Sequence, residues 1–580
     1  MFLPTTPGEM KELGWDGLDV ILVTGDAYID SPFVGVAVIG KILLDAGYRV
    51  GIIAQPDRDS GEDIGRLGEP RLFWGVTAGC IDSMVANYTA TGRRRKQDDY
   101  TPGNINNRRP DRATIVYSNL IRTYFKKTSP IVLGGIEASL RRIAHYDFQS
   151  DTIRRSILFD AKADYLLYGM ADRSVVELAN CIRTGDDPRG IRGICYSSPV
   201  IPAGCLELPS FEDAARDNAA FTDMFRRFYR NNDPVTALPL AQKHGNRYLI
   251  QTPPAYVLTG KELDAVHDLD YEREVHPYYR KQGEVKALDT IGFAITTHRG
   301  CYGECNFCSI SIHQGRQITS RSRESILGEA RTFTLHPRFK GIIQDVGGPT
   351  ANMYGIDCTR KEKRGCCPDK RCLFPKICSS LTIDHGKQIS LLKALRGVKG
   401  VRQVFIASGI RHDLILADRK HGTDYLKQVI RYHVSGQLKL APEHSEPGVL
   451  EKMGKSGRDT LLAFRNLFFE LVKQGEKRLF LTYYLIAAHP GCTEDDMARL
   501  RAFALGDLQC LPEQVQLFTP TPSTWSTVMY RTGLDPFTGK PCFVEKTCRG
   551  RERQKDILAD RRTKKQQPGR SRINKPGASR

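Results

Sequence analysis

The sequence lacks any apolar run near the length of about 18 residues that a membrane-spanning helix needs. It also begins without the basic segment and the long apolar stretch of a secretory signal. Internal repeats are absent as well. We therefore expect a cytoplasmic protein with no membrane partner.

Composition excludes other classes. Hydrophobic residues make up 40% and charged residues 26% of the 580 residues. This balance is typical of globular proteins and excludes a disordered chain, a collagen and a coiled-coil rod. The length predicts about three folded units.

The net charge of +19 is unevenly distributed. Residues 545–580 contain 13 basic and 4 acidic residues, so this segment alone carries +9. Such a tail is a candidate for contacting nucleic acid, and a solvated charge run is the alternative. No aromatic residue follows Phe543, so the tail lacks a platform on which bases could stack.

Short apolar runs alternate with helix-like segments and predict an α/β protein. We expect an open, doubly wound domain over residues 1–200. A mostly helical connector is expected over 201–285, followed by a partial barrel of about six β-α steps over 286–520. Residues 521–580 predict an irregular extension, with a largely disordered basic tail from residue 560.

Sixteen cysteines in a chain without a secretory signal favour a reducing compartment, where clustered cysteines bind metals or do redox chemistry. Five of them crowd 21 residues, with basic residues between them: Cys358, Cys366, Cys367, Cys372 and Cys378. We interpret this group as a second metal site, either an auxiliary iron–sulfur cluster or a zinc knuckle.

Three other cysteines, Cys301, Cys305 and Cys308, follow a predicted strand with the spacing C-x3-C-x2-C. Tight spacing lets one loop wrap one iron–sulfur cluster. Three ligands for a four-iron cluster leave one iron open for a substrate or cofactor. A zinc site is the alternative and would need a fourth ligand, for which His298 and His313 are conceivable.

This stretch resembles the C-x3-C-x-aromatic-C signature of radical S-adenosylmethionine (SAM) enzymes, with Phe307 at the aromatic position. The resemblance implies a [4Fe-4S] cluster whose open iron binds SAM. One electron from the cluster then cleaves SAM to a 5′-deoxyadenosyl radical. It also implies an electron donor such as a flavodoxin or a ferredoxin.

Downstream motifs keep the order of that family over residues 285–520. The resemblance implies that Gly347 and Gly348 receive the methionine amino group, with Pro349 and Thr350 replacing the family's acidic residue. It further implies that Arg411, in the strand end that begins at Ser408, pairs with the cofactor carboxylate, and that Glu443 contacts the ribose hydroxyls. The residues that the resemblance assigns to the cofactor are Phe307, Gly347, Gly348, Pro349, Thr350, Ser408, Arg411 and Glu443. For Arg411, a surface ion pair is the alternative. Across the whole chain, the sequence resembles the YgiQ group (UPF0313) of radical SAM proteins.

The first 200 residues resemble the cobalamin-binding domain that precedes the barrel in several radical SAM families, through residues 131–135 and 163–169. The cobalt-ligating pattern Asp-x-His-x-x-Gly is not met, because Tyr28 replaces the histidine and Ser31 the glycine. The resemblance therefore implies the fold and leaves cobalamin doubtful.

We expect a radical SAM enzyme acting on an unknown substrate. One alternative is a non-catalytic nucleic-acid-binding protein in which the cluster braces the fold. Another is transfer of a methyl or methylthio group to RNA or another macromolecule. An enzyme should bring Gly347, Gly348 and Glu443 together around the three cysteines, whereas a binding module has no reason to do so.

Overall fold

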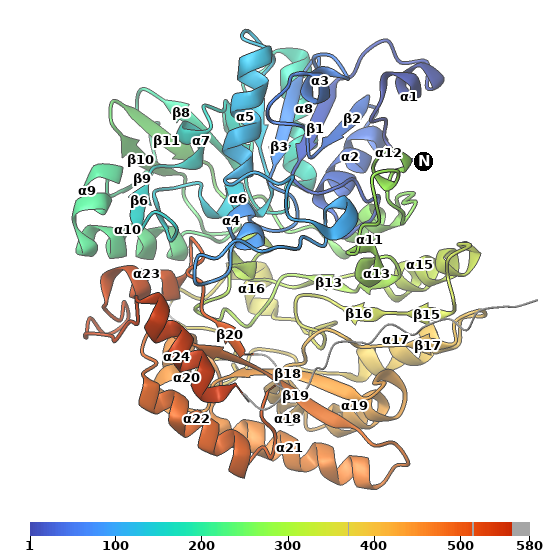
Figure 1. The fold of residues 1–580 in the computed structure, drawn as a ribbon, viewed down its shortest axis with the longest axis vertical. Helices are drawn as coiled ribbons and strands as arrows, with labels where there is room; N and C mark the ends of the chain where they lie inside the picture. The colour runs from blue at the N-terminus through green and yellow to red at the C-terminus, as the bar shows by residue number, and fades with distance from the viewer. Residues whose placement is uncertain (369, 513–514, 560–580) are drawn as a thin grey trace, which may run out of the picture.

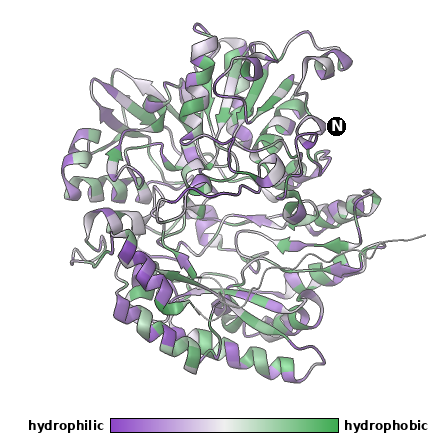
Figure 2. Ribbon diagram, in the orientation of Figure 1, coloured by the Kyte–Doolittle hydropathy of each residue, from purple (hydrophilic) through white to green (hydrophobic). Residues whose placement is uncertain are grey.

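The computed structural model describes residues 1–368, 370–512 and 515–559, which form two α/β halves stacked on each other (Figure 1). A nine-stranded sheet organises the N-terminal half, and short parallel strands organise the second half. Apolar residues concentrate in the strands of both halves (Figure 2). Among the described residues, no helix combines the length and apolar character that crossing a bilayer requires.

The large sheet has the strand order β2-β1-β3-β4-β7-β8-β11-β10-β9. Its first five strands run parallel, and antiparallel pairs join β7, β8, β11 and β10. Their bounds are β1 Val20–Thr24, β2 Val50–Ala54, β3 Phe73–Thr77, β4 Ile131–Leu133, β7 Tyr165–Leu167, β8 Ile194–Ser198, β9 Leu206–Leu208, β10 Leu240–His244 and β11 Arg247–Gln251.

Helices cover both faces of this sheet. Successive side chains of a strand point to opposite faces, and in β1 the side chains on both faces are buried. In β1, Val20 and Leu22 pack with helices α2 (Gly35–Asp45) and α8 (Asp172–Thr184). Ile21 and Val23 pack on the other face with α5 (Ala113–Tyr124). The open, doubly wound domain is therefore confirmed.

Residues 201–285 differ from the expected helical connector, since three of their strands complete the large sheet. Strands β10 and β11 form a hairpin in which His244 pairs with Arg247. Gly245 and Asn246 make its two-residue turn, a typical hairpin signal that outweighs the helical pattern nearby. The segment also carries helices α9 Phe211–Arg216, α10 Asn218–Arg230, α11 Gly260–Asp268 and α12 Pro277–Arg280.

The second half is a partial barrel, as expected, with parallel pairs β12·β16, β15·β17 and β18·β19·β20. A parallel bridge between Ile410 and Leu440 links the third strand position to the fourth. The strands are β12 Ala294–Thr296, β15 Ile342–Ile343, β16 Asp345–Gly347, β17 Gln403–Val404, β18 Gln437–Glu443, β19 Phe480–Ala487 and β20 Val515–Leu517. Helices around them include α15 Arg323–Leu335, α17 Gly386–Arg396, α19 Gly422–Gln428, α21 Arg458–Lys473 and α22 Glu494–Gly506.

Shorter elements fill the connections in both halves. They are α1 Pro7–Glu12, α3 Glu62–Gly65, α4 Ser83–Asn87, η1 Pro102–Asn104, α6 Gly135–Leu140, β5 His145–Asp147, β6 Thr152–Arg154, α7 Ile157–Asp160, η2 Pro188–Gly190, α13 Leu288–Ile291, β13 His298–Arg299, α14 Ile310–His313, β14 Thr319–Ser320, α16 Thr359–Arg364, α18 His412–Ala417, η3 Val429–His433 and α20 Pro447–Met453.

The C-terminal extension contains two helices before residue 560, in addition to the irregular segments that the sequence predicts. It forms helices α23 (Trp525–Thr532) and α24 (Cys548–Leu558). Trp525 packs edge-on against Phe225 of the first half, with ring centroids 4.7 Å apart. In α24, Gln554 Nε2 donates to the Cys492 carbonyl at 2.9 Å. The expected disordered tail, residues 560–580, lies outside the described residues.

Candidate functional site

The three-cysteine loop lies between β13 and α14, directly after the first barrel strand. Gly300 opens the loop with φ +86°, and a Cβ atom there would lie 1.9 Å from the Gln317 carbonyl oxygen, so only glycine fits. All three thiols are half-buried. Burial raises the pKa of the Cys301 thiol, and it raises the pKa of Cys308 to about 12.

Two of the three sulfur atoms of this loop lie beside Gly303. Its amide donates to Cys301 Sγ at 3.3 Å, and a Cβ atom on it would lie 3.6 Å from Cys305 Sγ. Within the described part of the chain, no cysteine belongs to a group of three donor atoms within 4.8 Å of one another. A single zinc ion needs such a group, because zinc–sulfur bonds are about 2.3 Å long. In a four-iron cluster each thiolate binds a different iron, so the three cysteines fit an iron–sulfur cluster better than a single zinc ion.

The end of β16 places the predicted glycine pair beside the cysteine loop. A Cβ atom on Gly348 would lie 2.6 Å from His298 Nε2, so the backbone here passes directly over the imidazole. The next residues turn back toward the cysteines, and Thr350 Oγ1 lies 3.7 Å from Cys301 Sγ. The strand end and the cysteine loop therefore form one site.

Ser408 and Arg411 follow the next barrel strand. The Asp345 carboxylate accepts hydrogen bonds from the Ser408 hydroxyl and from the Ser408 amide at 3.1 Å, which fixes this turn. Arg411 is buried and forms a two-pronged ion pair with Asp413, so it is not the surface ion pair of the alternative interpretation. Its Nη1 points at Cys305, 3.7 Å from the sulfur.

Glu443 ends β18 with φ +71° and is buried. Burial raises the pKa of its carboxyl group, while Lys455 Nζ, 3.5 Å away, opposes that rise. The Glu443 charge in turn contributes to raising the pKa of Cys308, so the two groups are electrostatically coupled. Phe307 lies edge-on to the His489 ring, with centroids 6.2 Å apart.

Sequence reasoning missed the partners that fix these residues, namely Asp345, Asp413 and Lys455. Of the three, Asp413 would have been the easiest to predict from the sequence, because it follows Arg411 by two residues. Sequence reasoning also missed a polar group at the starts of α17 and α19, in which Asp384, Asp418 and His421 bring three donor atoms within 4.8 Å of one another.

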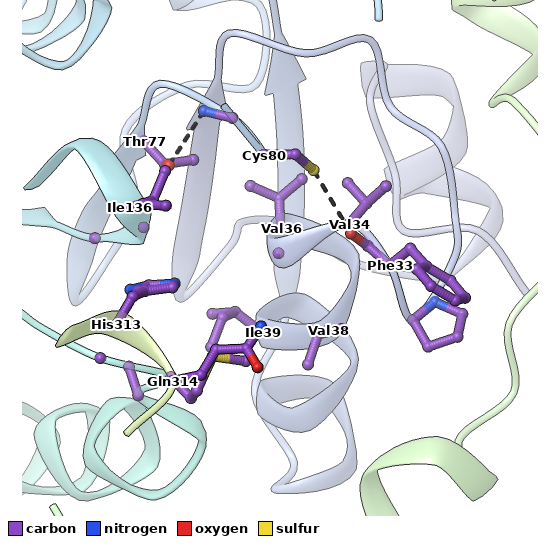
Figure 3. A pocket seen from close by; sticks show the side chains of 18 of the residues that line it. Phe33, Val34, Val36, Val38, Ile39, Thr77, Cys80, Ile136, His313 and Gln314 are labelled. Atoms are coloured by element: carbon purple, nitrogen blue, oxygen red, sulfur yellow. Dashed lines mark hydrogen bonds between the residues drawn. The ribbon is translucent and has the colours of Figure 1, made fainter. Parts of the chain in front are cut away.

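A cavity of about 450 Å³ lies between the carboxyl ends of β1, β3, β4 and β7 and the cysteine-bearing half (Figure 3). Four predicted cofactor residues form part of its wall, namely Gly347, Gly348, Pro349 and Ser408. The residues 131–135 and 163–169 that resemble a cobalamin domain contribute Gly134, Gly135 and Gly169.

Tyr28, which replaces the cobalt-ligating histidine, is fully buried. Its hydroxyl accepts a hydrogen bond from the Leu3 amide and donates to Asp30, both at 3.2 Å. Its ring stacks on His276, with centroids 5.4 Å apart. Tyr28 is thus committed to packing the N-terminal segment and does not serve as a cobalt ligand.

The second cysteine group is more buried than its polar neighbours in sequence suggested. Cys358 and Cys372 pack in a small apolar core with Tyr302 and Leu373. The Cys366 amide donates to Asp233 at 2.9 Å, and burial raises the pKa of its thiol to about 12. Among the residues that the structure describes, these thiols belong to no group of three donor atoms that a single ion could bind, and the second metal site stays a prediction.

Comparison with known families identifies relatives over nearly the whole chain. The family described as "Radical SAM N-terminal" matches residues 2–294. A UPF0313 protein of Fusobacterium nucleatum is 53% identical over 562 residues, covering 97% of this chain and 99% of the relative. A UPF0313 protein of Thermotoga petrophila is 49% identical, covering 96% of this chain and 98% of the relative.

Solved structures with a related arrangement are more distant. The radical SAM methyltransferase TsrM from Kitasatospora setae, with tryptophan and a SAM analogue bound, is 15% identical, with a TM-score of 0.46 over 87% of this chain and 75% of that one. The cobalamin-dependent radical SAM enzyme OxsB, with aqua-cobalamin and SAM bound, is 11% identical, with a TM-score of 0.49 over 91% and 57%. These values are too low to transfer a ligand or a reaction.

Proposed function

This chain belongs to the UPF0313 family of radical SAM proteins, and we propose that Cys301, Cys305 and Cys308 hold its [4Fe-4S] cluster and leave one iron for SAM. Membership makes the chain a radical SAM enzyme with an iron–sulfur cluster and SAM as cofactors. The residues that hold them and the substrate belong to the proposal.

The observation that carries the proposal is the meeting of three strand ends at the cysteine loop. Thr350 follows the β16 end and lies 3.7 Å from Cys301 Sγ, and Arg411 lies 3.7 Å from Cys305 Sγ. Glu443 ends β18, and the loop is tied to the helix that follows this strand, because the Asn306 amide donates to the Met453 carbonyl at 2.9 Å. Barrel enzymes place their sites at this carboxyl end of the strands.

When bound, the cluster would supply the electron that cleaves SAM to methionine and a 5′-deoxyadenosyl radical. The chain's own part is to bind, orient and keep out water. In this assignment, the Gly347 and Gly348 backbone receives the methionine amino group, together with Pro349 and Thr350. Ser408 and Arg411 face the methionine carboxylate.

Glu443 is assigned to the ribose hydroxyls, and Phe307 of the cysteine loop is assigned to the same cofactor. Lys455 Nζ lies 3.5 Å from the Glu443 carboxylate and restrains this side chain. Its positive charge offsets the effect of burial, which disfavours the charged form of Glu443. Asp413 orients Arg411 in the same way, since it occupies Nε and Nη2 and leaves Nη1 free to face the cluster. A flavodoxin or ferredoxin is proposed as the electron donor.

The test is anaerobic reconstitution of the full chain, followed by iron analysis and reduction with dithionite in the presence of SAM. We expect about four irons at this site and formation of 5′-deoxyadenosine. Cys305→Ala should lose both, whereas Cys548→Ala, which changes an exposed cysteine in α24, should keep both. Formation of 5′-deoxyadenosine by the variant lacking all three cysteines would refute the assignment.

A further inference from the structure

The cavity in Figure 3 lies where an open α/β sheet binds ligands. In the strand order β2-β1-β3-β4-β7, the chain runs from β1 outward to β2 and from β3 in the opposite direction to β4. The gap between β1 and β3 is therefore a topological switch point, where open α/β sheets bind ligands. Asp26 follows β1, and Gly79 follows β3, and both line the cavity. The opposite wall comes from the barrel, through Gly347 and Gly348. A molecule here would face both the sheet and the proposed SAM site.

Most of the wall is apolar. Val34, Val36 and Ile39 of the α2 region and Ile136 of α6 surround the space shown in Figure 3. Two polar groups in this part of the wall already have partners within the protein. Cys80 Sγ lies 3.6 Å from the Phe33 carbonyl oxygen, and the Gly79 amide donates to Thr77 Oγ1 at 3.2 Å.

Every charged side chain in the cavity wall is paired with another protein group. Asp26 forms an ion pair with Arg109 at 2.7 Å. Arg299 forms one with Asp172 at 2.8 Å. The third charged group, Asp345, accepts hydrogen bonds from the Ser408 turn. An anionic ligand would therefore lose its hydration without meeting a free cation, which is costly. Among the described residues of the wall, the one carboxylate without a cationic partner, Asp345, is already occupied by the Ser408 turn.

Among the described residues, one buried polar side chain in the wall has no hydrogen-bond partner at either of its polar atoms, whereas His298, also in the wall, lacks a partner only at Nε2. His267 of α11 is 96% buried, and within the described part of the chain neither of its ring nitrogens makes a hydrogen bond. Buried polar groups of this kind are rare in proteins and point to a missing partner. His313, also in the wall, uses Nδ1 with the Ser139 hydroxyl at 3.2 Å. Burial lowers the pKa of both imidazoles, so both are neutral donors and acceptors.

We propose that this cavity is the substrate site and that it takes an uncharged, mainly apolar small molecule carrying one hydrogen-bonding group for His267. The inference rests on the proposed function, because the radical must form at the barrel wall of the same cavity. Its volume of about 450 Å³ falls in the range of ordinary small-molecule pockets. Nucleotides, nucleic acids and other polyanions are excluded as occupants by the paired charges.

The test uses three fluorescent probes of similar shape with the reconstituted full chain and SAM. 1-Aminoanthracene is neutral and carries a hydrogen-bonding group, anthracene is neutral and carries none, and anthracene-9-carboxylate is an anion. Fluorescence titration should give 1-aminoanthracene a Kd at least about tenfold below that of the carboxylate. Ile136→Trp should raise the Kd of 1-aminoanthracene at least about tenfold by filling the cavity. Leu335→Trp, at a position 85% exposed, should leave it unchanged.

His267→Phe should weaken binding of 1-aminoanthracene and leave the binding of anthracene intact. If Ile136→Trp fails to fold, judged by circular dichroism and iron content, Val36→Phe takes its place. Equal binding of the neutral and anionic probes, no binding of 1-aminoanthracene to the wild type, or unchanged binding in the cavity variants would overturn the inference. Formation of 5′-deoxyadenosine, measured on the same samples, separates the two proposals, because normal cleavage without probe binding refutes only the substrate site.

Discussion

Arg411 Nη1 lies 3.7 Å from Cys305 Sγ, while the other side of the same guanidinium is paired with Asp413. Both charged residues are buried. Asp413 thus keeps the arginine in place before any cofactor binds, and the arginine presents one N–H group to the thiolate loop. A fixed cation at this point would offset the negative charge of the thiolates and attract the SAM carboxylate.

Replacing Arg411, alone or together with Asp413, should distinguish its effect on protein stability from its effect on SAM binding. Arg411→Gln leaves Asp413 buried and unpaired, so we expect a loss of about 3–5 kcal/mol in the free energy of unfolding. The double variant Arg411→Gln/Asp413→Asn should recover most of that loss. Both variants should bind SAM at least about tenfold more weakly, as measured by equilibrium dialysis of the reconstituted protein.

The double variant is the decisive sample, since it tests SAM binding in a protein of near-normal stability. If it binds SAM as tightly as the wild type, Arg411 is a structural residue. Asp413→Asn alone serves as the control, because it keeps the cation and removes only the acid that orients it. It should weaken SAM binding less than Arg411→Gln does.

Gly348→Ala should block the site by crowding. The new Cβ atom would lie 2.6 Å from the His298 ring and 2.8 Å from the His298 carbonyl oxygen, and the backbone contact leaves little room to relax. We expect a stability loss of about 1–3 kcal/mol, typical of overpacking, and at least about tenfold slower SAM cleavage. Gly409→Ala is the matched control, because its Cβ atom would have nothing within 4 Å.

Sequence patterns located the barrel strands and the cysteine loop because these signals are local. The buried partners escaped, since Lys455 meets Glu443 only after the chain folds. The α24 helix was missed for a different reason. Its buried positions include Gly550, Arg551 and Gln554, so it lacks the apolar stripe from which amphipathic helices are recognised. Its anchoring instead uses polar contacts, such as Arg551 Nη1 donating to the Ala90 carbonyl at 2.6 Å.

The second cysteine group is tested by metal analysis. In a variant lacking Cys301, Cys305 and Cys308, residual iron or zinc should persist, as measured by plasma mass spectrometry. The residual metal should disappear when alanine also replaces four of the five thiols of this group, at Cys366, Cys367, Cys372 and Cys378. Replacing the isolated Cys181 and Cys205 instead should change nothing. A metal-free three-cysteine variant would contradict the second site.

Stability should fall in mild acid because buried histidines are held neutral. Burial lowers the pKa of His433 to about 4, from an ordinary value of about 6.5. Between these two values the unfolded chain binds a proton that the folded chain does not, so the contribution is present above pH 6.5 and is lost as pH falls toward 4. From pH 7.5 to 5.5, His433 alone should cost about 1 kcal/mol.

Urea unfolding at both pH values measures this contribution. His433→Asn replaces the ring nitrogen that lies 2.8 Å from the Val404 carbonyl oxygen with an amide that does not titrate. The variant should lose about 1 kcal/mol less than the wild type between pH 7.5 and 5.5, whatever its absolute stability. The same pH dependence in both proteins would show that His433 is not held neutral.

The basic tail is best tested by a truncation that spares α24. Residues 560–580 hold eight Lys and Arg residues and one Asp, a net +7, whereas α24 before them packs on the barrel through Gln554. Cations that neutralise phosphates release counterions, so RNA binding through the tail must weaken as salt rises. Sequence preference should be weak, because phosphate contacts carry no base readout.

Deleting 560–580 should therefore lower the affinity for a mixed-sequence RNA oligonucleotide and flatten its salt dependence, measured by fluorescence anisotropy. Formation of 5′-deoxyadenosine should persist, because every residue assigned to SAM lies before residue 450. If truncated and full-length proteins bind RNA alike across the salt series, the tail is only a solvated charge run.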